Sequence, residues 1–329
     1  MIRTLDPLQS SLLKSAGTLF STAGGPASLL VLIYHRVLPC ADPLLPDEPD
    51  AVAFAAQMDL IRQNFNILPL REAVARLARH ELPARAVCIT FDDGYANNCE
   101  LALPILAQRG IPATVFVAPG FLSGGRMFND TVIEALRHAP EDFDLSDMGL
   151  GHYTLQDSQA RVKAVSSILP VLKYLPAAER LARASDIAER AGSTLPSDLM
   201  MSEEQVRRLH RNGIEIGAHT VNHPILARLD DDTARREIAE SKARLESITG
   251  SAVTSFAYPN GGPGADYTRR DVALAREAGF DLAVSTAWGA ATASRDAFQI
   301  PRIAPWDRTA LRFGVRMARA YRQRTATLA

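Results

Sequence analysis

The alternation of short apolar runs with longer helix-like segments constrains the fold of this chain more than any other feature. The apolar runs have the length and the Val, Ile, Leu and Phe content of fully buried strands. They lie at 29–34, 87–91, 113–117, 214–218, 254–258 and 282–285, with a shorter one near 298–300. The helix-like segments between them end where a C-terminal cap is expected, at Gly110, Gly213, Gly250 and Gly279. This order predicts β-α-β units and an α/β fold with a parallel sheet.

About seven strands favour a barrel-like closure over an open sheet, although periodicity alone does not separate the two. Residues 120–200 break the alternation, because they contain helical patterns at 130–138, 161–174 and 177–191 and no convincing strand. We expect this segment to be a helical insertion in a strand-to-helix loop. The expected domains are a helical extension over 1–27, a barrel over 28–305 and a basic helix over 306–329.

The overall charge does not favour a nucleic acid or an acidic polymer as a partner. Lys and Arg number 36 and Asp and Glu 37, which gives a net charge of −1. Arginines are nevertheless concentrated near the end of the chain: Arg308, Arg312, Arg316, Arg319, Arg322 and Arg324. The first four have helical spacing. A solvated helix face is the favoured interpretation, and contact with an anionic membrane surface or a partner surface is the alternative.

Cysteine usage and hydropathy favour a cytoplasmic protein. The chain has 3 cysteines, Cys40, Cys88 and Cys99, and an odd number without a CxxC motif argues for a reducing compartment. The chain has no run of about 20 apolar residues, so no membrane-spanning helix is expected. The stretch from Met1 to Phe20 is interrupted by polar residues and makes a poor secretory signal.

Two adjacent carboxylates follow one of the expected strands. Asp92 and Asp93 come directly after the run 87–91, and Gly94 allows a sharp turn that could aim both side chains into one pocket. Burial raises the free energy of two neighbouring negative charges, and a cation would offset it. An N-cap for the next helix is the alternative, but a cap needs one Asp only.

Two histidines follow another expected strand. His219 and His223 come after 214–218 with a spacing of four, and Pro224 disfavours helical geometry at His223. Imidazoles at this spacing can hold a divalent transition metal, although two surface histidines in a loop fit the spacing equally well. Strand ends in a parallel barrel meet at one face, so the histidines and one carboxylate could form a metal site with open positions.

Such a site suits hydrolysis of an amide or an ester. A metal lowers the pKa of a bound water and polarises a carbonyl, and a second carboxylate can accept the proton. Asp93 on the metal and Asp92 as the general base fit these roles. The sequence does not support a serine hydrolase, because the chain contains no Gly-x-Ser-x-Gly motif.

The segments Thr90-Phe91-Asp92-Asp93-Gly94 and His219-Thr220-Val221-Asn222-His223 together resemble the polysaccharide deacetylases, which are carbohydrate esterases with a nodulation-type deacetylase domain. The resemblance covers roughly residues 28–305 without the insertion. It implies a distorted (β/α) barrel and a Zn²⁺-type metal held by Asp93, His219 and His223. It also implies Asp92 as the catalytic base and the removal of N-acetyl groups from acetylated amino sugars.

The resemblance also implies residues that contact the substrate. Tyr258, Pro259 and Asn260 look like the family's third motif, a wall of the sugar groove, and Trp288 resembles the aromatic residue of the fourth. We expect Tyr95 and Arg302 to contact the substrate as well. The third motif usually has an arginine two residues before its proline, where this chain has Ala257.

The fifth motif of the family carries a histidine that acts as the general acid, and here Arg302 stands in its place. We hypothesise that His35, at the end of the first strand, takes part in the site instead. Arg302 or Arg36 could then supply the charge that orients Asp92. A packed, hydrogen-bonded residue at a strand end is the equally weighted alternative for His35.

The function expected from the sequence is metal-dependent N-deacetylation of an amino-sugar polysaccharide or its precursor, of the type associated with exopolysaccharide synthesis. The partners expected are an N-acetylated glycan and, through the basic C-terminal helix, a membrane or the exopolysaccharide machinery. Two alternatives stay open. One is a catalytically idle barrel that binds glycan, and the other is a metal-dependent amidase that acts on a small non-sugar amide.

Overall fold

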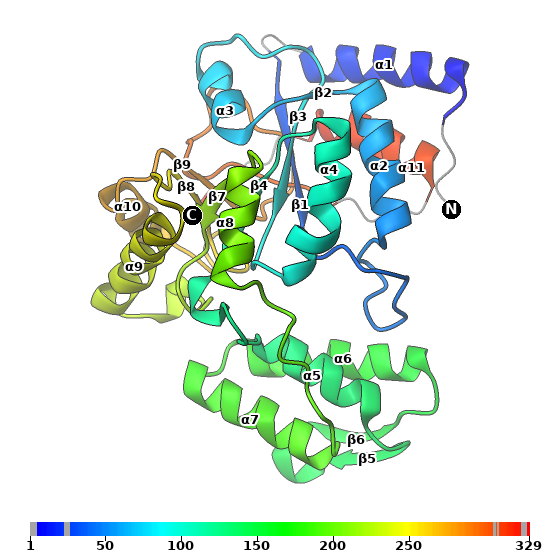
Figure 1. The fold of residues 1–329 in the computed structure, drawn as a ribbon, viewed down its shortest axis with the longest axis vertical. Helices are drawn as coiled ribbons and strands as arrows, with labels where there is room; N and C mark the ends of the chain where they lie inside the picture. Colours follow the sequence, from blue (N-terminus) through cyan, green and yellow to red (C-terminus); the bar gives the residue numbers. More distant parts are fainter. Residues whose placement is uncertain (1–4, 23–26, 305–306, 308, 324–327) are drawn as a thin grey trace.

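The computed structural model describes residues 5–22, 27–304, 307, 309–323 and 328–329. Its centre is a parallel sheet with the order β1-β3-β4-β7-β8-β9 (Figure 1). The short β2 pairs with the first residues of β3, and β4 pairs with the last residues of β3. The strands are β1 Leu29–Tyr34, β2 Asn66–Ile67, β3 Ala86–Phe91, β4 Thr114–Val117, β7 Glu215–Ala218, β8 Ser255–Ala257 and β9 Leu282–Val284. Most of these strands are fully buried, as expected for a parallel sheet that is covered by helices.

Helices connect consecutive strands and cover the outside of the sheet. They are α2 Ala51–Asn64, α3 Leu70–Ala78, α4 Leu103–Arg109, α8 Glu203–Arg211, α9 Asp231–Thr249 and α10 Arg269–Glu277. A π-helical turn, Asn98–Ala102, precedes α4, and short 3₁₀ turns lie at Pro119–Phe121, Ser146–Met148 and Leu226–Arg228. Local chemistry fixes several helix ends: Asp50 and Ser202 cap α2 and α8, and Gly110 and Gly250 end α4 and α9 in the left-handed conformation that glycine favours.

The sheet closes into a distorted barrel through an irregular segment, which confirms the expected barrel-like closure. Ile300 forms a parallel bridge with Val284 in β9, and Ile303 forms one with Leu32 in β1. The expected strand near 298–300 is therefore a set of isolated bridges, and the seventh strand is β2. Sequence analysis missed β2 because two residues give no periodicity.

Two further helices lie against the amino-terminal end of the barrel. They are α1 Pro7–Thr22 and α11 Ala310–Ala320, which pack side by side, with Gly314 against Leu13. The side chain of Arg85, the residue before β3, contacts α1 at Thr18, and the Tyr321 hydroxyl donates to the Ala86 carbonyl. Arg308 and Arg324, part of the predicted arginine cluster, lie outside the described residues.

Residues between β4 and α8 form a separate lobe below the barrel in Figure 1, with its own apolar core. It contains α5 Phe128–His138, α6 Ser158–Lys173 and α7 Ala177–Arg190, as expected, and in addition an antiparallel hairpin of β5 Asp142–Leu145 and β6 Gly151–Thr154. The expectation that this insertion lacks strands is wrong. Because β5 has only four residues, two of them aspartates, it is too short and too polar to be recognised.

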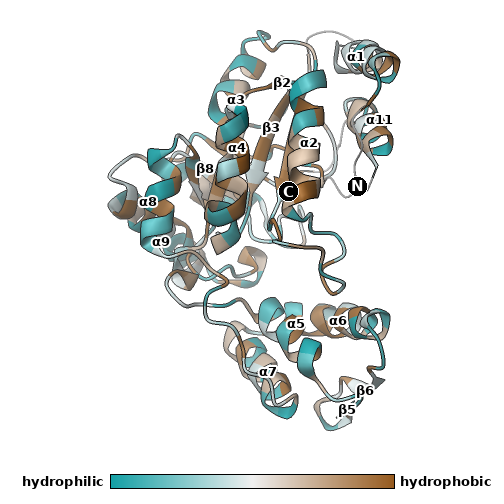
Figure 2. Ribbon diagram, turned by 45° about the vertical axis from the view of Figure 1, so that its right-hand side comes forward, coloured by the Kyte–Doolittle hydropathy of each residue, from teal (hydrophilic) through white to brown (hydrophobic). Residues whose placement is uncertain are grey.

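Apolar residues line the inner faces of both parts of the molecule (Figure 2). In the described part of the chain, no helix combines the length and the apolar character that a bilayer span requires.

Candidate metal centre and active site

The turn after β3 aims two carboxylates into one cavity. The backbone of Asp92 continues the sheet by donating to the Tyr34 carbonyl at 2.9 Å, and the chain then turns sharply. Asp93 has a φ of +75° and Gly94 a φ of +90°. A positive φ is uncommon for a residue with a Cβ, so the surrounding structure must stabilise this backbone conformation of Asp93. The turn brings both carboxylates to the carboxyl end of the barrel.

The loop after β7 positions the two histidines. Thr220 and His223 also have positive φ values, +59° and +50°, and the His223 amide donates to the Thr220 hydroxyl at 3.1 Å. The Glu237 carboxylate on α9 accepts from the amides of Val221 and Asn222 at 2.9 and 2.8 Å. This carboxylate holds the loop in its tight shape. Sequence analysis did not find Glu237, because it lies on another helix and in no motif.

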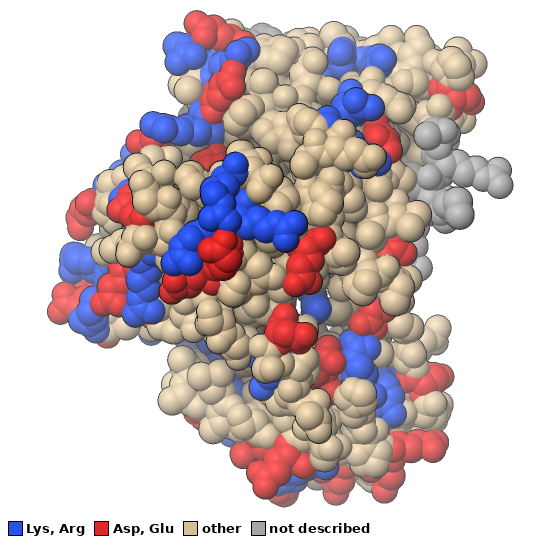
Figure 3. Space-filling view, viewed as in Figure 1, with Lys and Arg blue, Asp and Glu red and all other residues tan. Residues whose placement is uncertain are grey.

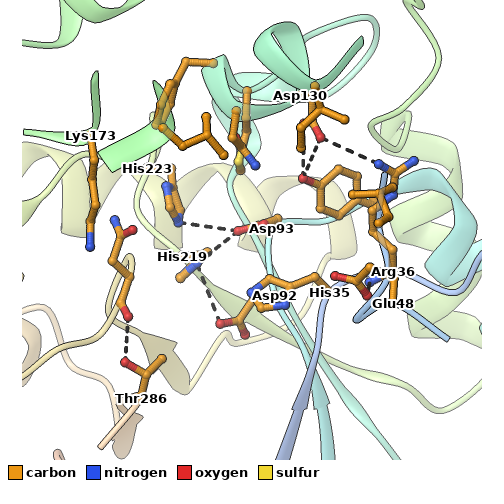
Figure 4. A pocket seen from close by; sticks show the side chains of 18 of the residues that line it. His35, Arg36, Glu48, Asp92, Asp93, Asp130, Lys173, His219, His223 and Thr286 are labelled. Atoms are coloured by element: carbon orange, nitrogen blue, oxygen red, sulfur yellow. Dashed lines mark hydrogen bonds and ion pairs between the residues drawn. The ribbon is translucent and has the colours of Figure 1, made fainter. Parts of the chain in front are cut away.

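Asp93, His219 and His223 form one cluster (Figure 4). The Asp93 Oδ1 atom lies 3.4 Å from His219 Nε2 and 3.5 Å from His223 Nε2, and the three ligand atoms are all within 4.8 Å of one another. The Nδ1 of His219 is 2.8 Å from the Ala257 carbonyl oxygen. A hydrogen bond at Nδ1 leaves Nε2 as the ligand nitrogen. One oxygen and two imidazole nitrogens at these separations fit a divalent metal.

The charges in this cluster shift its titration. Burial alone would raise the pKa of Asp93, but the neighbouring histidines reverse the effect and hold that pKa below its usual range. Burial lowers the pKa of His223 to about 4, so this imidazole is neutral and can offer a lone pair. Burial would lower the pKa of His219 too, but the charges of Asp92 and Asp93 raise it. The cluster therefore joins one ionised carboxylate, one neutral imidazole and one imidazole, His219, whose proton the two aspartates stabilise and which a bound metal would displace.

Arg302 is paired with Asp92 at the base of the site. Its two terminal nitrogens donate to the two carboxylate oxygens at 2.7 and 2.6 Å, and both side chains are almost fully buried. The Nε of Arg302 donates to the Ser285 carbonyl at 3.0 Å, which fixes the guanidinium. Burial would raise the pKa of Asp92, but the guanidinium and nearby histidines lower it. Asp92 is therefore ionised and held in one orientation.

The cluster opens into a cavity of about 580 Å³ between the barrel and the lobe. Among the residues predicted for the site, the structure brings Asp92, Asp93, His219, His223, His35, Tyr95 and Asn260 to this cavity. His35 lies beside Asp92, and it is among the groups that lower the pKa values of Asp92 and Asp93 (Figure 4). Asn260, in the loop after β8, also has a left-handed backbone conformation, with a φ of +60°.

Four residues expected to contact the substrate do not line the cavity. Arg302 lies behind Asp92, so it contacts the Asp92 carboxylate and does not line the cavity. Tyr258 is fully buried, stacks on Tyr267 and donates its hydroxyl to the Phe298 carbonyl, and Pro259 is also buried. Trp288 packs against the barrel core and donates to Gln323. The motif positions are present, but the backbone directs these side chains inward.

The opposite wall of the cavity comes from the lobe and from the loop after β1. Asp130, at the start of α5, accepts from the Tyr95 hydroxyl and lies 3.7 Å from an Arg36 nitrogen. Burial raises the pKa of Asp130 to about 7. Glu48 and Lys173 also line the cavity, on opposite sides of it (Figure 4). Sequence analysis missed Asp130, Glu48 and Lys173, because only the packing of the lobe brings them near the strand ends.

Comparison with known proteins gives a consistent result. A model of the polysaccharide deacetylase family matches residues 79–283, more than half of the chain. YxkH of Bacillus subtilis (strain 168), provisionally named a polysaccharide deacetylase, is 22% identical over 280 residues, which cover 84% of this chain and 71% of that protein.

Solved structures share the fold. The Streptococcus pyogenes deacetylase PplD in complex with acetate aligns with a TM-score of 0.60 and 19% identity, covering 89% of this chain and 99% of that one. IcaB from Ammonifex degensii aligns with a TM-score of 0.58 and 22% identity, covering 91% and 98%. At these identities the likeness shows the fold, which confirms the predicted distorted (β/α) barrel.

Proposed function

Because this chain belongs to the polysaccharide deacetylase family of hydrolytic enzymes, we propose that it removes N-acetyl groups from an amino-sugar polysaccharide or its precursor in a metal-dependent reaction. One observation carries the proposal. The oxygen of Asp93 and the Nε2 atoms of His219 and His223 lie within 4.8 Å of one another, beside a second carboxylate that an arginine holds ionised.

We assign the metal to Asp93, His219 and His223, and we propose zinc because imidazole and carboxylate donors with open positions suit it. When bound there, the metal would polarise the acetyl carbonyl and lower the pKa of a water molecule. The set of two histidines and one carboxylate also suits Fe²⁺, so the metal content has to be measured.

Asp92 is the proposed general base. Its pairing with Arg302 keeps it ionised and fixes the plane of its carboxylate where it lines the cavity. Each carboxylate oxygen has two lone pairs, so Asp92 can accept a proton while both oxygens stay bonded to Arg302. The carboxylate would take the proton of the attacking water.

His35 is the proposed general acid. It lines the cavity beside Asp92, and its backbone carbonyl accepts from the Asn98 side chain at 2.9 Å, which fixes its position at the end of β1. A protonated imidazole there could donate to the leaving amine as the bond between nitrogen and the acetyl carbon breaks. Arg302 stands where the family has its general-acid histidine, but it is bound to Asp92, so this assignment gives the role of the acid to His35.

The cavity supports an N-acetylated sugar as the substrate. About 580 Å³ lies within the range of small-ligand sites, and Tyr95 and Asn260 offer polar groups beside the metal cluster. The structurally similar deacetylase PplD was solved with acetate, which is the product this proposal expects. A small non-sugar amide is the second candidate, because residues of the barrel and of the lobe together bound the site as one cavity of about 580 Å³.

Acetate release tests the proposal. The full chain would be assayed on an N-acetylated chito-oligosaccharide and on a small non-sugar acetamide, with and without a chelator. We expect activity on the sugar alone, lost with chelator and restored by Zn²⁺. Asp92→Asn should lower kcat by about 10²–10⁴-fold. His35→Ala should lower it too, whereas His210→Ala, at a half-buried position on α8 that does not line the cavity, should not.

Each outcome bears on a separate part of the proposal. Activity on the acetamide alone would replace the sugar with a small amide. Full turnover by His35→Ala would remove His35 as the acid and leave the rest intact. Glycan binding without acetate release, with metal bound, would instead indicate an idle barrel.

A further inference from the structure

The outer face of α1 is apolar although the inner face of the helix is already packed. Leu13 and Gly17 are buried against the protein, whereas Leu8, Leu12 and Leu19 are 70%, 62% and 65% exposed. These three leucines follow one another at spacings of four and seven, which places them in one stripe on the side away from the core. A helix that is apolar on opposite faces normally has both covered.

The neighbouring α11 extends this apolar surface. Leu311 and Val315 are 49% and 38% exposed on the outer face of α11, which packs beside α1. Among the described residues, ten large apolar side chains are exposed, and five of them lie on these two helices. Exposed apolar side chains concentrated in this way mark an interaction surface.

The charge of the two helices is one-sided. Their sequences contain Lys14, Arg312, Arg316 and Arg319 and no Asp or Glu, and Arg322 is the second residue after α11. The nearby acidic residues are Asp6, directly before α1, and Asp307, which is paired with Arg316. Lys14, Arg312, Arg319 and Arg322 are exposed. The chain as a whole carries a net charge of −1, so this basic surface is a local feature. In Figure 3 the surface over α1, at the upper right, is mostly uncharged, with a few basic side chains and one acidic group at its right-hand end.

We propose that α1 and α11 form a docking surface for an anionic lipid bilayer. Leucines on an outer helix face with Lys and Arg beside them match an interfacial helix pair that inserts its apolar side chains among lipid headgroups. The basic residues would bind the acidic headgroups, each worth roughly 1 kcal/mol near a charged surface. A second copy of this chain would fit the leucines but would bring the same positive charges together, which disfavours it.

The position of this surface gives the docked protein a definite orientation. α1 and α11 contact Arg85 and Ala86, at the amino end of β3, whereas Asp92 and Asp93 follow its carboxyl end. The lipid surface and the cavity therefore lie at opposite ends of the barrel (Figure 1). In the docked protein the cavity would therefore face away from the bilayer. Together with the proposed function, this orientation favours a polymer as the substrate over a lipid-linked precursor.

Vesicle sedimentation of the full chain tests the proposal. We expect binding to vesicles of phosphatidylcholine with phosphatidylglycerol, weak binding to phosphatidylcholine alone, and loss of binding at high salt. Replacing Leu8, Leu12 and Leu19 together by Gln, which keeps helix propensity, should lower the bound fraction at least about tenfold. Replacing Arg312, Arg319 and Arg322 by Gln should do the same on the anionic vesicles.

Controls separate docking from misfolding and from the deacetylase assignment. Leu181→Gln, an exposed leucine on α7 of the lobe, should bind like the wild type. All variants should keep their acetate release from a soluble oligosaccharide, because the stripe is remote from the cavity. Binding that is equal for wild type and both triple variants would overturn the proposal. So would a dimer in solution that the leucine substitutions dissociate, because the stripe would then be a contact between copies.

Discussion

The pair between Asp92 and Arg302 sets the chemistry of the site at the scale of single residues. Both side chains are buried, so neither charge is compensated by solvent. An arginine can bind a carboxylate with two parallel hydrogen bonds, which a lysine cannot do. The guanidinium therefore supplies both a charge and an orientation, and Arg302 is a positioning residue for the proposed base.

Arg302→Lys is expected to separate these two contributions. The variant keeps a positive charge near Asp92 but loses the second hydrogen bond, so kcat should fall by roughly tenfold or more while KM changes little. Steady-state acetate release measures both constants. The exposed Arg319→Lys on α11 is the matched control and should behave like the wild type. An unchanged kcat for Arg302→Lys would contradict the positioning role.

Sequence analysis predicted some side-chain positions better than others. Asp92, Asp93, His219 and His223 follow strand ends, and strand ends of a parallel barrel meet, so their proximity follows from topology. Tyr258 and Trp288 were expected in the groove because of their place in motifs. Their direction depends on how the loops after β8 and β9 turn, which a motif does not encode.

At the scale of elements, defined backbone and side-chain hydrogen bonds join the barrel to the lobe. The strand-like segment Leu199–Met201 leaves the lobe and pairs with the turn after β3. The Met201 amide donates to the Gly94 carbonyl at 3.0 Å, and the Ala96 amide donates to the Leu199 carbonyl at 2.8 Å. Sequence periodicity found the long helices of the lobe. It gave no sign of this connection, because backbone pairing between distant segments leaves no local pattern.

A second link joins the loop after β1 to the lobe. Asp42 accepts from Arg137 on α5 with both oxygens, at 3.0 and 2.6 Å. Burial would raise the pKa of Asp42, but the Arg137 guanidinium and the Leu44 amide lower it overall. A carboxyl whose pKa is lower in the folded state stabilises that state above its unfolded pKa and loses the effect as the pH falls through the folded value.

Asp42→Asn should therefore lower stability at neutral pH and not in acid. We expect a loss of about 1 kcal/mol at pH 7, because solvent screens a partly exposed pair. The difference from the wild type should shrink below about pH 4, as the carboxyl of the wild type is protonated. Urea unfolding at several pH values measures this, with Asp47→Asn, exposed in the same loop, as the control. A pH-independent difference would contradict the ion-pair explanation.

At the scale of the whole molecule, the lobe supplies one wall of the cavity at the candidate site. The end of α6 lies over the cavity, where the Lys173 ammonium lies 3.1 Å from Asp266 of the barrel and near the Tyr174 ring. Asp266 is buried, so the loss of its partner would leave an unpaired charge. The insertion was predicted from sequence, but its role as a wall was not, because it depends on how two separate cores meet.

Lys173→Met tests the contribution of the lobe to substrate binding. Without the ion pair, α6 should exchange its backbone amides faster, and KM for an N-acetylated oligosaccharide should rise several-fold with kcat little changed. Hydrogen exchange and steady-state kinetics measure these effects. Lys163→Met, an exposed position on the same helix, is the matched control. If the two variants behave alike, the lobe wall does not help to hold the substrate.

The most direct test of the whole account is the position of the metal. Crystals of the protein grown with Zn²⁺ would be measured on both sides of the zinc absorption edge. We predict one anomalous peak in contact with Asp93 Oδ1, His219 Nε2 and His223 Nε2, and its loss, together with the loss of acetate release, in Asp93→Asn. An active, zinc-free protein, or a peak elsewhere with these three side chains unliganded, would contradict the account.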